Sequence, residues 1–325
     1  MRAKTIKGVK SPLVSVIVPV EPEGDVSGCI RTLKTFVWPK TRIECFVVRG
    51  QQPSRQRNLA AKKSRGEWLL FLDSDSQGMP ELIERLVGAA LQFGADVAGG
   101  PNLPPQDEAW PGRAFSAVLA SYFGSMSARA RYSSQGITRL SSEKELILCN
   151  LLIRREVFLK GGGFREDLYP NEENEFLNRV GAEGSRLLYV PEAVVRRPRR
   201  NSLAAFAEQA FRYGRGRMRQ MRTNFFMGDL IHLLPLAALF YVVGLAFAAG
   251  QAPWMIDGLL LYVAADLLAG LQILLQKSDL AAALLSLLLF PLRHFAYALG
   301  LLAGLGVSPS TLNANSTIRV QKQRL

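Results

Sequence analysis

Two carboxylates that suit a metal ion stand two residues apart in the first quarter of the chain, in Asp73-Ser74-Asp75. They directly follow the apolar run 68–72, which predicts a buried strand. Residues two apart in extended backbone point to the same side, so both carboxylates can approach one cation. Mg²⁺ or Mn²⁺ prefers oxygen ligands and commonly joins protein carboxylates to a diphosphate. Asp and Ser are also ordinary turn residues, so the motif alone leaves a metal site and a plain turn equally open.

A second acidic cluster, Asn171-Glu172-Glu173-Asn174-Glu175, follows the glycine run 161–163, which suits a loop. The apolar spacing after Glu173 predicts a helix. Carboxylates are favourable at a helix N-terminus, which is a purely structural explanation. The chemical explanation is a general base that takes the proton of an acceptor hydroxyl. Taken alone, the cluster favours the structural explanation.

The elements that must position these acids alternate between strand and helix patterns. The predicted strands are 13–18, 44–48, 68–72 and 97–99, and the helices between them begin near Asp25, Ser54 and Pro80. This alternation predicts an α/β layer with a largely parallel sheet. In such sheets the ligand lies beyond the carboxyl ends of the strands, where 19–23, 49–50 and 73–75 fall.

The order and spacing of these motifs resemble the inverting GT-A glycosyltransferases of family 2. The resemblance covers about residues 12–200, and its landmarks are 14–20, 54–60, 65–75, 150–158, 162–164 and Glu172-Glu173 followed by Arg179. The membrane-anchored layout described below is similar to the succinoglycan-type branch, which extends lipid-linked or exported polysaccharides. The resemblance implies a Rossmann-like GT-A nucleotide-sugar domain of the α/β class, followed by an interfacial helix and an α-helical transmembrane region.

The resemblance also implies roles for single residues. Asp73 and Asp75 match the site where a divalent metal, Mg²⁺ or Mn²⁺, meets the diphosphate of the nucleotide sugar. Pro19 and Glu23 fall at the family's first loop near the nucleotide, and Arg57-Asn58 matches its Arg-Asn pair on the helix facing the donor. Glu172-Glu173 takes the place of a Glu-Asp pair whose second member is the usual base, which makes Glu173 the expected base.

The chain departs from the family pattern at two places. Glu173 is one methylene longer than the usual Asp, so the backbone or the acceptor has to shift to suit it. After the second predicted strand the family usually has acidic residues and a Gly-Ser-x-Asp turn, whereas this chain has Arg49-Gly50-Gln51-Gln52-Pro53. The contact to the nucleotide base, and with it the choice among UDP, GDP or another nucleotide, is therefore left open.

A further motif, Gln209-Ala210-Phe211-Arg212-Tyr213, resembles the QxxRW of membrane polysaccharide synthases. Gln209 and Arg212 stand three residues apart, so both can point from one helix face. Arg212 would then pair with the leaving diphosphate while the aromatic residue stacks on an acceptor sugar. The alternative is an amphipathic interfacial helix whose lipid side carries Leu203, Phe206, Ala210 and Tyr213.

Charge and hydropathy are unevenly distributed over the 325 residues, which carry a net charge of +13. Nine arginines lie between positions 196 and 222, directly before the apolar segments 230–250, 258–276 and 280–307. Basic clusters also bind nucleic acid, but arginines beside apolar spans follow the positive-inside rule. We therefore expect membrane lipid as a partner, and no nucleic acid.

The remaining composition points to the cytosolic face of the cell (inner) membrane. No apolar segment follows the N-terminus as in a signal peptide, and Cys29, Cys45 and Cys149 form no CxxC pair. We expect a multi-pass protein with a cytosolic catalytic domain. Three spans would leave the C-terminus outside, whereas the basic tail prefers the inside, and the sequence does not settle this conflict.

Two charges interrupt the apolar segments. Asp266 lies near the middle of 258–276, and Arg293 lies near the middle of 280–307. An ion pair between them would lower the cost of both charges in a membrane. The alternative, slightly favoured, is that Arg293 with His294 marks a break at the membrane surface, where it meets lipid phosphate, and that Pro291 kinks the segment.

The expected domains are a tail (1–11), the GT-A domain (12–200), an Arg-rich amphipathic helix (201–228), a transmembrane region (229–307) and a basic tail (308–325). The expected activity is inverting transfer of a sugar from a nucleotide-diphosphate donor to a lipid-linked saccharide or polysaccharide acceptor. One alternative is transfer to a polyprenyl phosphate, whose oxyanion needs no base. Another is a catalytically silent membrane scaffold. Sugar, linkage, acceptor and oligomeric state are not indicated.

Overall fold

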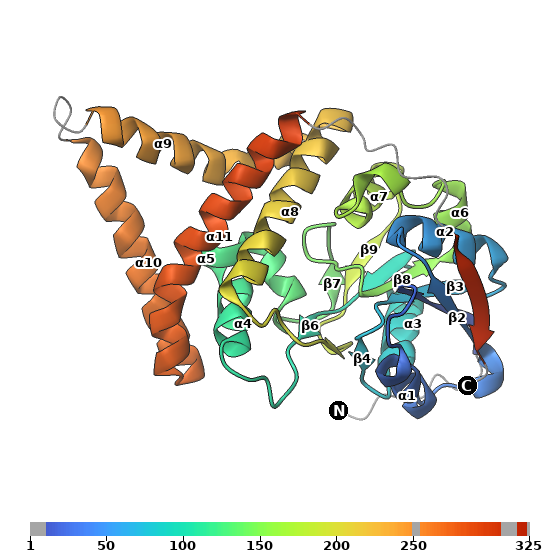
Figure 1. Cartoon of the computed structure of the whole chain (residues 1–325). Helices are drawn as coiled ribbons and strands as arrows, with labels where there is room; N and C mark the ends of the chain where they lie inside the picture. The colour runs from blue at the N-terminus through green and yellow to red at the C-terminus, as the bar shows by residue number, and fades with distance from the viewer. Residues whose placement is uncertain (1–10, 249–253, 307–316, 324–325) are drawn as a thin grey trace.

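A mixed eight-stranded sheet forms the centre of the molecule (Figure 1). The computed structural model describes residues 11–248, 254–306 and 317–323. The strand order is β11-β2-β1-β3-β8-β5-β9-β7. The strands are β1 (Val14–Val20), β2 (Ile43–Arg49), β3 (Trp68–Leu72), β5 (Val97–Gly99), β7 (Arg139–Leu140), β8 (Asn150–Arg154), β9 (Leu187–Tyr189) and β11 (Arg319–Gln323). The four predicted strands are thus confirmed as β1, β2, β3 and β5, and β7, β8 and β11 run against them.

Helices cover both faces of the sheet because the strands are apolar on both sides. Val14, Val16 and Val18 of β1 pack with α1 (Ser27–Thr35) and α3 (Leu82–Phe93), while the intervening Ile17 packs with the opposite layer. That layer consists of α2 (Pro53–Lys63), α6 (Arg155–Lys160) and α7 (Glu172–Ala182). Gly94 ends α3 with a φ of 58°, a backbone conformation that suits glycine.

Shorter elements connect the sheet to the C-terminal helices. A small second sheet contains β4 (Gln77–Gly78), β10 (Val195–Arg196) and β6 (Asn102–Leu103). The short helices are α4 (Gly112–Ala120), α5 (Tyr122–Ser125) and the 3-10 turns η1 (Lys40–Arg42), η2 (Met126–Arg131), η3 (Glu166–Leu168) and η4 (Met227–Leu233). In the second sheet, β10 lies beside β4, which follows the Asp73–Asp75 loop, so the chain after β10 reaches that loop.

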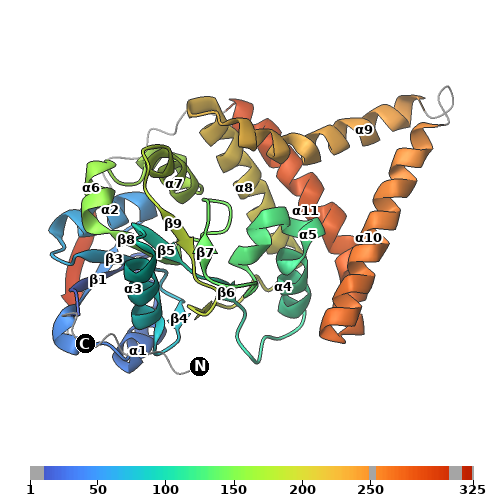
Figure 2. The ribbon, with the colours of Figure 1, turned by 180° about the vertical axis from the view of Figure 1, so that it is seen from behind.

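The C-terminal helices are α8 (Leu203–Thr223), α9 (Leu234–Ala248), α10 (Met255–Lys277) and α11 (Leu280–Gly306). Three segments, Met227–Phe247, Met255–Lys277 and Leu280–Gly306, are long and apolar enough to cross a membrane. Seen from either side, α9 and α10 spread away from the sheet while α11 stays beside α8 (Figures 1 and 2). The ends of the predicted segments at 249–250 and 307 lie outside the described residues.

The helix α8 is packed against protein on the side that the amphipathic pattern assigned to lipid. The rings of Phe206 and Phe115 stack with their centroids 4.7 Å apart, and Ala210 is fully buried. On α11, a Cβ on Gly300 would meet the backbone oxygen of Phe211. The two helix backbones therefore touch, and the lipid side of α8 expected from the sequence is corrected to an internal face.

Neither sequence interpretation of Arg293 matches the structure. Its guanidinium donates to the backbone oxygen of Gly124 at 2.7 Å and to Ser125 Oγ at 3.3 Å, not to Asp266. Asp266 Oδ1 is buried and has no hydrogen-bond partner among the residues that the structure describes. The helix α11 also continues through Pro291 without a break. The carbonyl of Gly124, at the end of α5, thus accepts the hydrogen bond of the Arg293 guanidinium.

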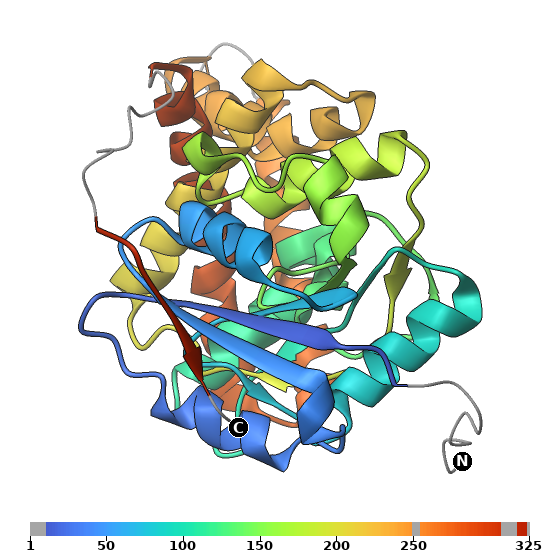
Figure 3. The ribbon, with the colours of Figure 1, turned by 90° about the vertical axis from the view of Figure 1, so that its right-hand side faces the viewer.

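The strand β11, in the segment predicted as a basic tail, returns to the sheet domain. It pairs antiparallel with β2 at the edge of the sheet, from Arg319 opposite Arg49 to Gln323 opposite Cys45 (Figure 3). Lys322 Nζ lies 2.8 Å from Glu44 Oε2, and Ser15 Oγ donates to the other carboxylate oxygen at 2.7 Å. The end of the described chain therefore belongs to the same body as its first strands.

Candidate active site

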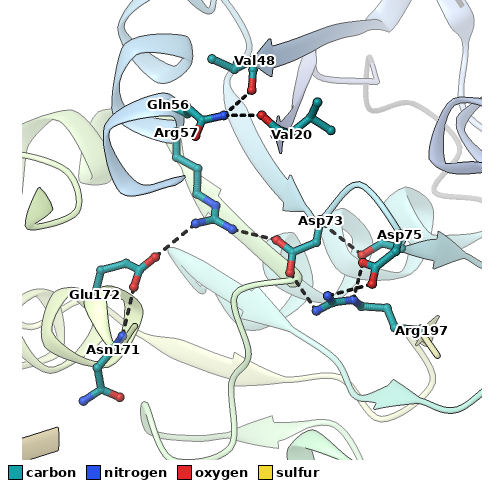
Figure 4. A network of polar contacts seen from close by, with 10 residues as sticks. Val20, Val48, Gln56, Arg57, Asp73, Asp75, Asn171, Glu172 and Arg197 are labelled. Carbon is teal, nitrogen blue, oxygen red and sulfur yellow. Dashed lines mark hydrogen bonds and ion pairs between the residues drawn. The ribbon is translucent and has the colours of Figure 1, made fainter. Parts of the chain in front are cut away.

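A continuous chain of ion pairs joins the two acidic motifs (Figure 4). Arg57 on α2 is buried and donates through Nη2 to Asp73 Oδ1 at 2.7 Å and through Nη1 to Glu172 Oε1 at 3.1 Å. The end of β3 supplies Asp73, and the first turn of α7 supplies Glu172. Three of the predicted site residues are thus brought together.

Arg197, which follows β10, holds the other side of the Asp73–Asp75 motif. Its Nη1 lies 2.8 Å from Asp73 Oδ2, and its Nε and Nη2 donate to the two oxygens of Asp75 at 2.6 and 3.1 Å. Sequence reasoning missed this residue. The basic run 196–200 was the available signal, but nothing local indicates which arginine reaches a site 122 residues earlier.

Both arginines keep Asp73 ionised. Burial by itself would raise the pKa of Asp73, but Arg197 and then Arg57 outweigh it and hold the pKa below its usual value. The two carboxylates offer hard oxygen ligands on one side of the loop, which fits Mg²⁺ or Mn²⁺. No cluster of three or more metal-ligating side chains occurs among the described residues. A metal would therefore take its other ligands from a diphosphate and water, and Arg197 would have to leave the carboxylates.

The two adjacent glutamates have different surroundings. Glu172 is almost fully buried, and its Oε2 accepts from the backbone N–H of Asn171 at 3.0 Å. Burial and then the neighbouring Glu173 raise the pKa of Glu172 to about 7, although Arg57 acts in the opposite direction. Glu173 points elsewhere, because its Oε1 lies 3.9 Å from Arg131 and its side chain is 13% exposed. Glu172 thus belongs to the ion-pair chain and Glu173 to a separate space.

That space is a cavity of about 860 Å³ between the sheet domain and the C-terminal helices. Glu173 and Asn171 line one end, together with Arg131 of η2 and Tyr213 of α8. Burial raises the pKa of Tyr213, which keeps its hydroxyl protonated. A carboxylate that faces a cavity of this size has room for an acceptor beside it.

Other predicted donor residues have structural contacts. Asn58 accepts from the backbone N–H of Phe164 at 2.9 Å and donates to the carbonyl of Phe164 at 2.8 Å and to Glu166 Oε1 at 3.1 Å. It therefore fixes the loop before α7 rather than facing Asp73. Pro19 is buried in β1, and Glu23 is exposed in the loop that follows.

Two residues to which the sequence analysis assigned no role shape this first loop. Arg49 Nη1 donates to the carbonyls of Pro22 and Gly24, each at 3.0 Å. Gln56 Nε2 donates to the carbonyl of Val20 at 2.9 Å and also to that of Val48, so it ties the ends of β1 and β2 together. Arg49, which departs from the family pattern, thus supports the loop that contains Glu23.

Gln209 and Arg212, the two residues predicted to act together from α8, both contact side chains of the same helix. Gln209 Nε2 donates to Tyr213 OH at 3.3 Å, within the helix. Arg212 is half exposed, and its Nε lies 3.4 Å from Glu208 Oε1 on the same helix. Arg219 is buried and donates to the backbone oxygen of Asp167. Arg212 therefore remains free to turn toward a ligand, whereas Arg219 supports the loop before α7.

Comparison with known families supports the resemblance read from the motifs. Residues 33–162 match the family model described as Glycosyl transferase family 2. An uncharacterized glycosyltransferase of Haemophilus influenzae is 27% identical over 150 residues. That alignment covers 42% of this chain and 42% of the relative, so the chain matches less than half of the length of this curated relative. The family 2 resemblance is confirmed for this segment, and the succinoglycan-type branch stays a prediction.

Comparison with solved structures confirms the predicted fold. The mannosyltransferase PcManGT from Pyrobaculum calidifontis, solved with GDP-Man and Mn²⁺, aligns with a TM-score of 0.62 at 16% identity. The alignment covers 91% of this chain and 88% of that one, so the shared GT-A-like fold extends into the C-terminal helices. TarS 1-349 of S. aureus, solved with UDP-GlcNAc, covers 94% of this chain and 96% of that one at 14% identity and a TM-score of 0.46, which supports no further argument.

Proposed function

We propose that this protein is an inverting glycosyltransferase that moves a sugar from a nucleotide-diphosphate donor to an acceptor at a membrane. The observation that carries the proposal is the linkage of the two acidic motifs. Asp73 and Glu172 share Arg57, and the next residue, Glu173, faces the 860 Å³ cavity. A diphosphate site and a base that faces an acceptor space are the two parts that such a reaction needs.

Each residue has one task in the proposed reaction. Glu173 takes the proton of an acceptor hydroxyl, whose oxygen bonds to the anomeric carbon of the donor as the bond to the diphosphate breaks. Asp73 and Asp75 would hold a divalent cation, which supplies positive charge to the leaving diphosphate. Arg57 forms ion pairs with both Asp73 and Glu172 and so fixes the positions of the two carboxylates relative to each other. Arg212 on α8 would turn from Glu208 to pair with the diphosphate, and Gln209 orients the Tyr213 hydroxyl.

The membrane arrangement follows from β11. Because β11 pairs with β2, the chain between α8 and β11 crosses any membrane an even number of times. The helix α11 lies along α8, so we infer that α9 and α10 form a membrane hairpin while α11 stays with the catalytic part. The arginines of α8 favour the cytosolic side of the inner membrane. With two crossings, the basic C-terminal tail would lie on the same side as the sheet domain.

The hairpin can be tested with single cysteines, because Cys29, Cys45 and Cys149 are all buried and give little background. In intact cells, an impermeant maleimide added outside should label Trp254→Cys at the start of α10. It should not label Gln321→Cys in β11. Labelling of Gln321→Cys from outside would contradict the topology, and failure to label Trp254→Cys would exclude a crossing hairpin.

Two other functions each have one observation in their favour. The arginine and lysine side chains that line the cavity favour a polyprenyl phosphate as the acceptor. Such an acceptor carries its own nucleophilic oxyanion and needs no base. The position of Arg197 on both aspartates favours a catalytically silent scaffold, because it fills the place of the metal.

A donor screen on the purified protein in detergent with Mn²⁺ or Mg²⁺ separates these functions. Metal-dependent turnover of a nucleotide sugar supports the enzyme, and its absence with every donor supports the scaffold. Glu173→Gln should keep donor binding and lose transfer to a saccharide hydroxyl by about 10²-fold or more. Unchanged transfer to a polyprenyl phosphate in this variant would identify the phosphate acceptor instead.

A further inference from the structure

Tyr169 is an exposed aromatic residue in a loop that is flanked by buried residues. The loop joins η3 to α7. Leu168 before Tyr169 is 2% exposed and Asn171 after it is 6% exposed, whereas Tyr169 itself is 46% exposed. No step of the reaction proposed above uses this ring. A large aromatic side chain that leaves its face uncovered is available to a ligand.

Contacts with α8 hold the loop in place. A Cβ on Gly216 would collide with the backbone oxygen of Pro170, so the loop backbone touches the helix directly. One turn later on α8, Gln220 Oε1 accepts a hydrogen bond from Asn171. Arg212 stands one turn before Gly216 on the same face of α8, which brings it to the side where the loop lies. An aromatic ring on a fixed backbone loses little conformational freedom when a ligand binds.

The same loop lies beside the chain of ion pairs in the candidate active site. Glu172 follows Tyr169 by three residues, and Arg57 connects Glu172 to Asp73 (Figure 4). Burial raises the pKa of Tyr169, and the charges that act on this pKa next are those of Glu172, Arg57, Asp73 and Arg212. The side chain therefore lies among the residues to which the proposed reaction assigns the diphosphate.

The direction in which a bound donor runs follows from the position of its diphosphate. In Figure 4 the ends of β1 and β2, marked by Val20 and Val48, lie on the opposite side of Arg57 from α7. The family resemblance places the nucleoside near the loops after these two strands. A diphosphate held at Asp73 then joins the nucleoside on the side of the strands to the sugar on the side of α7. The sugar thus reaches the loop that carries Tyr169.

We propose that Tyr169 binds the donor sugar by stacking its ring on the apolar face of that sugar. One face of a pyranose consists largely of C–H groups, which suit the negative face of an aromatic ring. The inference rests on the function proposed above and adds to it a residue that recognises the sugar, not the nucleotide. It leaves Glu173 free to act as the base on the acceptor.

The test measures donor binding without any acceptor, so it does not depend on turnover. Full-length protein in detergent with Mg²⁺ is titrated with UDP-glucose, UDP-N-acetylglucosamine and GDP-mannose, and separately with UDP and GDP. Saturation-transfer difference NMR then shows which protons of each donor contact the protein. The variants are Tyr169→Ala, Tyr169→Leu and Tyr169→Phe. The matched control is Phe225→Ala, because Phe225 is 52% exposed and does not line the cavity beside Glu173.

We expect Tyr169→Ala to bind the nucleotide sugar about 3- to 10-fold more weakly than the wild type, and to bind the nucleoside diphosphate equally well. The NMR signals of the sugar ring should weaken relative to those of the base. Tyr169→Phe keeps the ring and should match the wild type, whereas Tyr169→Leu lacks an aromatic face and should resemble Tyr169→Ala. Phe225→Ala should bind every ligand as the wild type does.

Several results would overturn the proposal. Equal losses for the nucleotide sugar and the nucleoside diphosphate in Tyr169→Ala would show that Tyr169 only supports the fold of the site. If Tyr169→Ala does not fold, as judged by its melting curve, the comparison of Tyr169→Leu with Tyr169→Phe decides. Equal binding by these two variants would exclude stacking, and a loss in Tyr169→Phe would assign the contact to the hydroxyl.

Donor turnover measured in parallel separates this proposal from the proposed function. Turnover by the wild type together with unchanged sugar binding in Tyr169→Ala refutes only the stacking. Sugar-ring contacts that disappear in Tyr169→Ala, without turnover by the wild type, support the stacking and refute only the transfer. Absence of binding by all three donors would overturn both.

Discussion

Replacement of Arg197 should make the free protein bind a divalent cation more tightly. In the structure the Arg197 guanidinium contacts Asp73 Oδ2 at 2.8 Å and both oxygens of Asp75. A metal that takes these carboxylates has to displace the arginine first. Arg197→Gln removes this competing cation and leaves both acids in place.

The size of the effect follows from the contacts. Hydrogen bonds between charged groups contribute about 1.5–3 kcal/mol net. The Asp75 side chain is 44% exposed, so solvent screening reduces its share. The Arg197 contacts therefore oppose Mn²⁺ binding by about 1–3 kcal/mol, which corresponds to about 5- to 150-fold in Mn²⁺ affinity. A nucleotide diphosphate that draws Arg197 away from Asp75 would bring the wild type close to the variant.

The assay is a titration of Mn²⁺ without a donor, with free Mn²⁺ followed by electron paramagnetic resonance. Arg196→Gln is the matched control, because Arg196 donates to the carbonyl of Pro104 at 2.6 Å and to neither aspartate. Addition of a nucleotide diphosphate should reduce the difference in Mn²⁺ affinity between Arg197→Gln and the wild type. If Arg197→Gln binds Mn²⁺ no more tightly than the wild type, the competition does not exist and this reasoning is refuted.

Three further variants test other parts of the structure. Because burial raises the pKa of Glu172 to about 7, the wild-type free energy of unfolding should fall as the pH rises from about 4.5 toward 7. The melting temperature of Glu172→Gln should change less with pH over this range. If the melting temperatures of both proteins change equally with pH, the raised pKa is contradicted. Gly300→Ala should lower the free energy of unfolding in detergent by about 1–3 kcal/mol, because its Cβ meets the α8 backbone, whereas Gly88→Ala, with no atom within 4 Å, should not destabilise. Arg212→Ala should change stability by less than about 0.5 kcal/mol, since its ion pair is on the surface, and should reduce turnover about tenfold; unchanged turnover would favour a helix with no catalytic role.

The core of the fold was predictable because it depends on local patterns. The apolar strands carry their own signal, and residues 73–75 follow the end of a strand as expected, since β3 ends at Leu72. The strand β11 was missed because its sequence, Arg-Val-Gln-Lys-Gln, has little apolar content. It pairs at the sheet edge through backbone hydrogen bonds, which leave no side-chain pattern to recognise.

Partners of polar side chains were the part that the sequence could not provide. Arg57 was expected near the donor and does contact Asp73, but its neighbour Asn58 binds the loop at Phe164 instead. Two adjacent positions on a helix point about 100° apart, and only tertiary structure shows what each one meets. The apolar face of α8 was likewise recognised, whereas the pattern cannot distinguish a covering of lipid from one of protein such as Phe115.

The edge position of β11 has a consequence for biosynthesis. The ribosome completes β2 at residue 49 and begins β11 at residue 319, so 319 − 49 = 270 residues separate the two partners. At about 5–20 residues per second, the edge of β2 waits roughly 15–50 s for its partner strand. Throughout that interval the nascent chain presents an unpaired edge, which is a template for aggregation. If the apolar helices enter a bilayer as proposed, they do so within the same interval. A failure of insertion would then also leave the central sheet unfinished, and a protease or chaperone could recognise the defect at that edge.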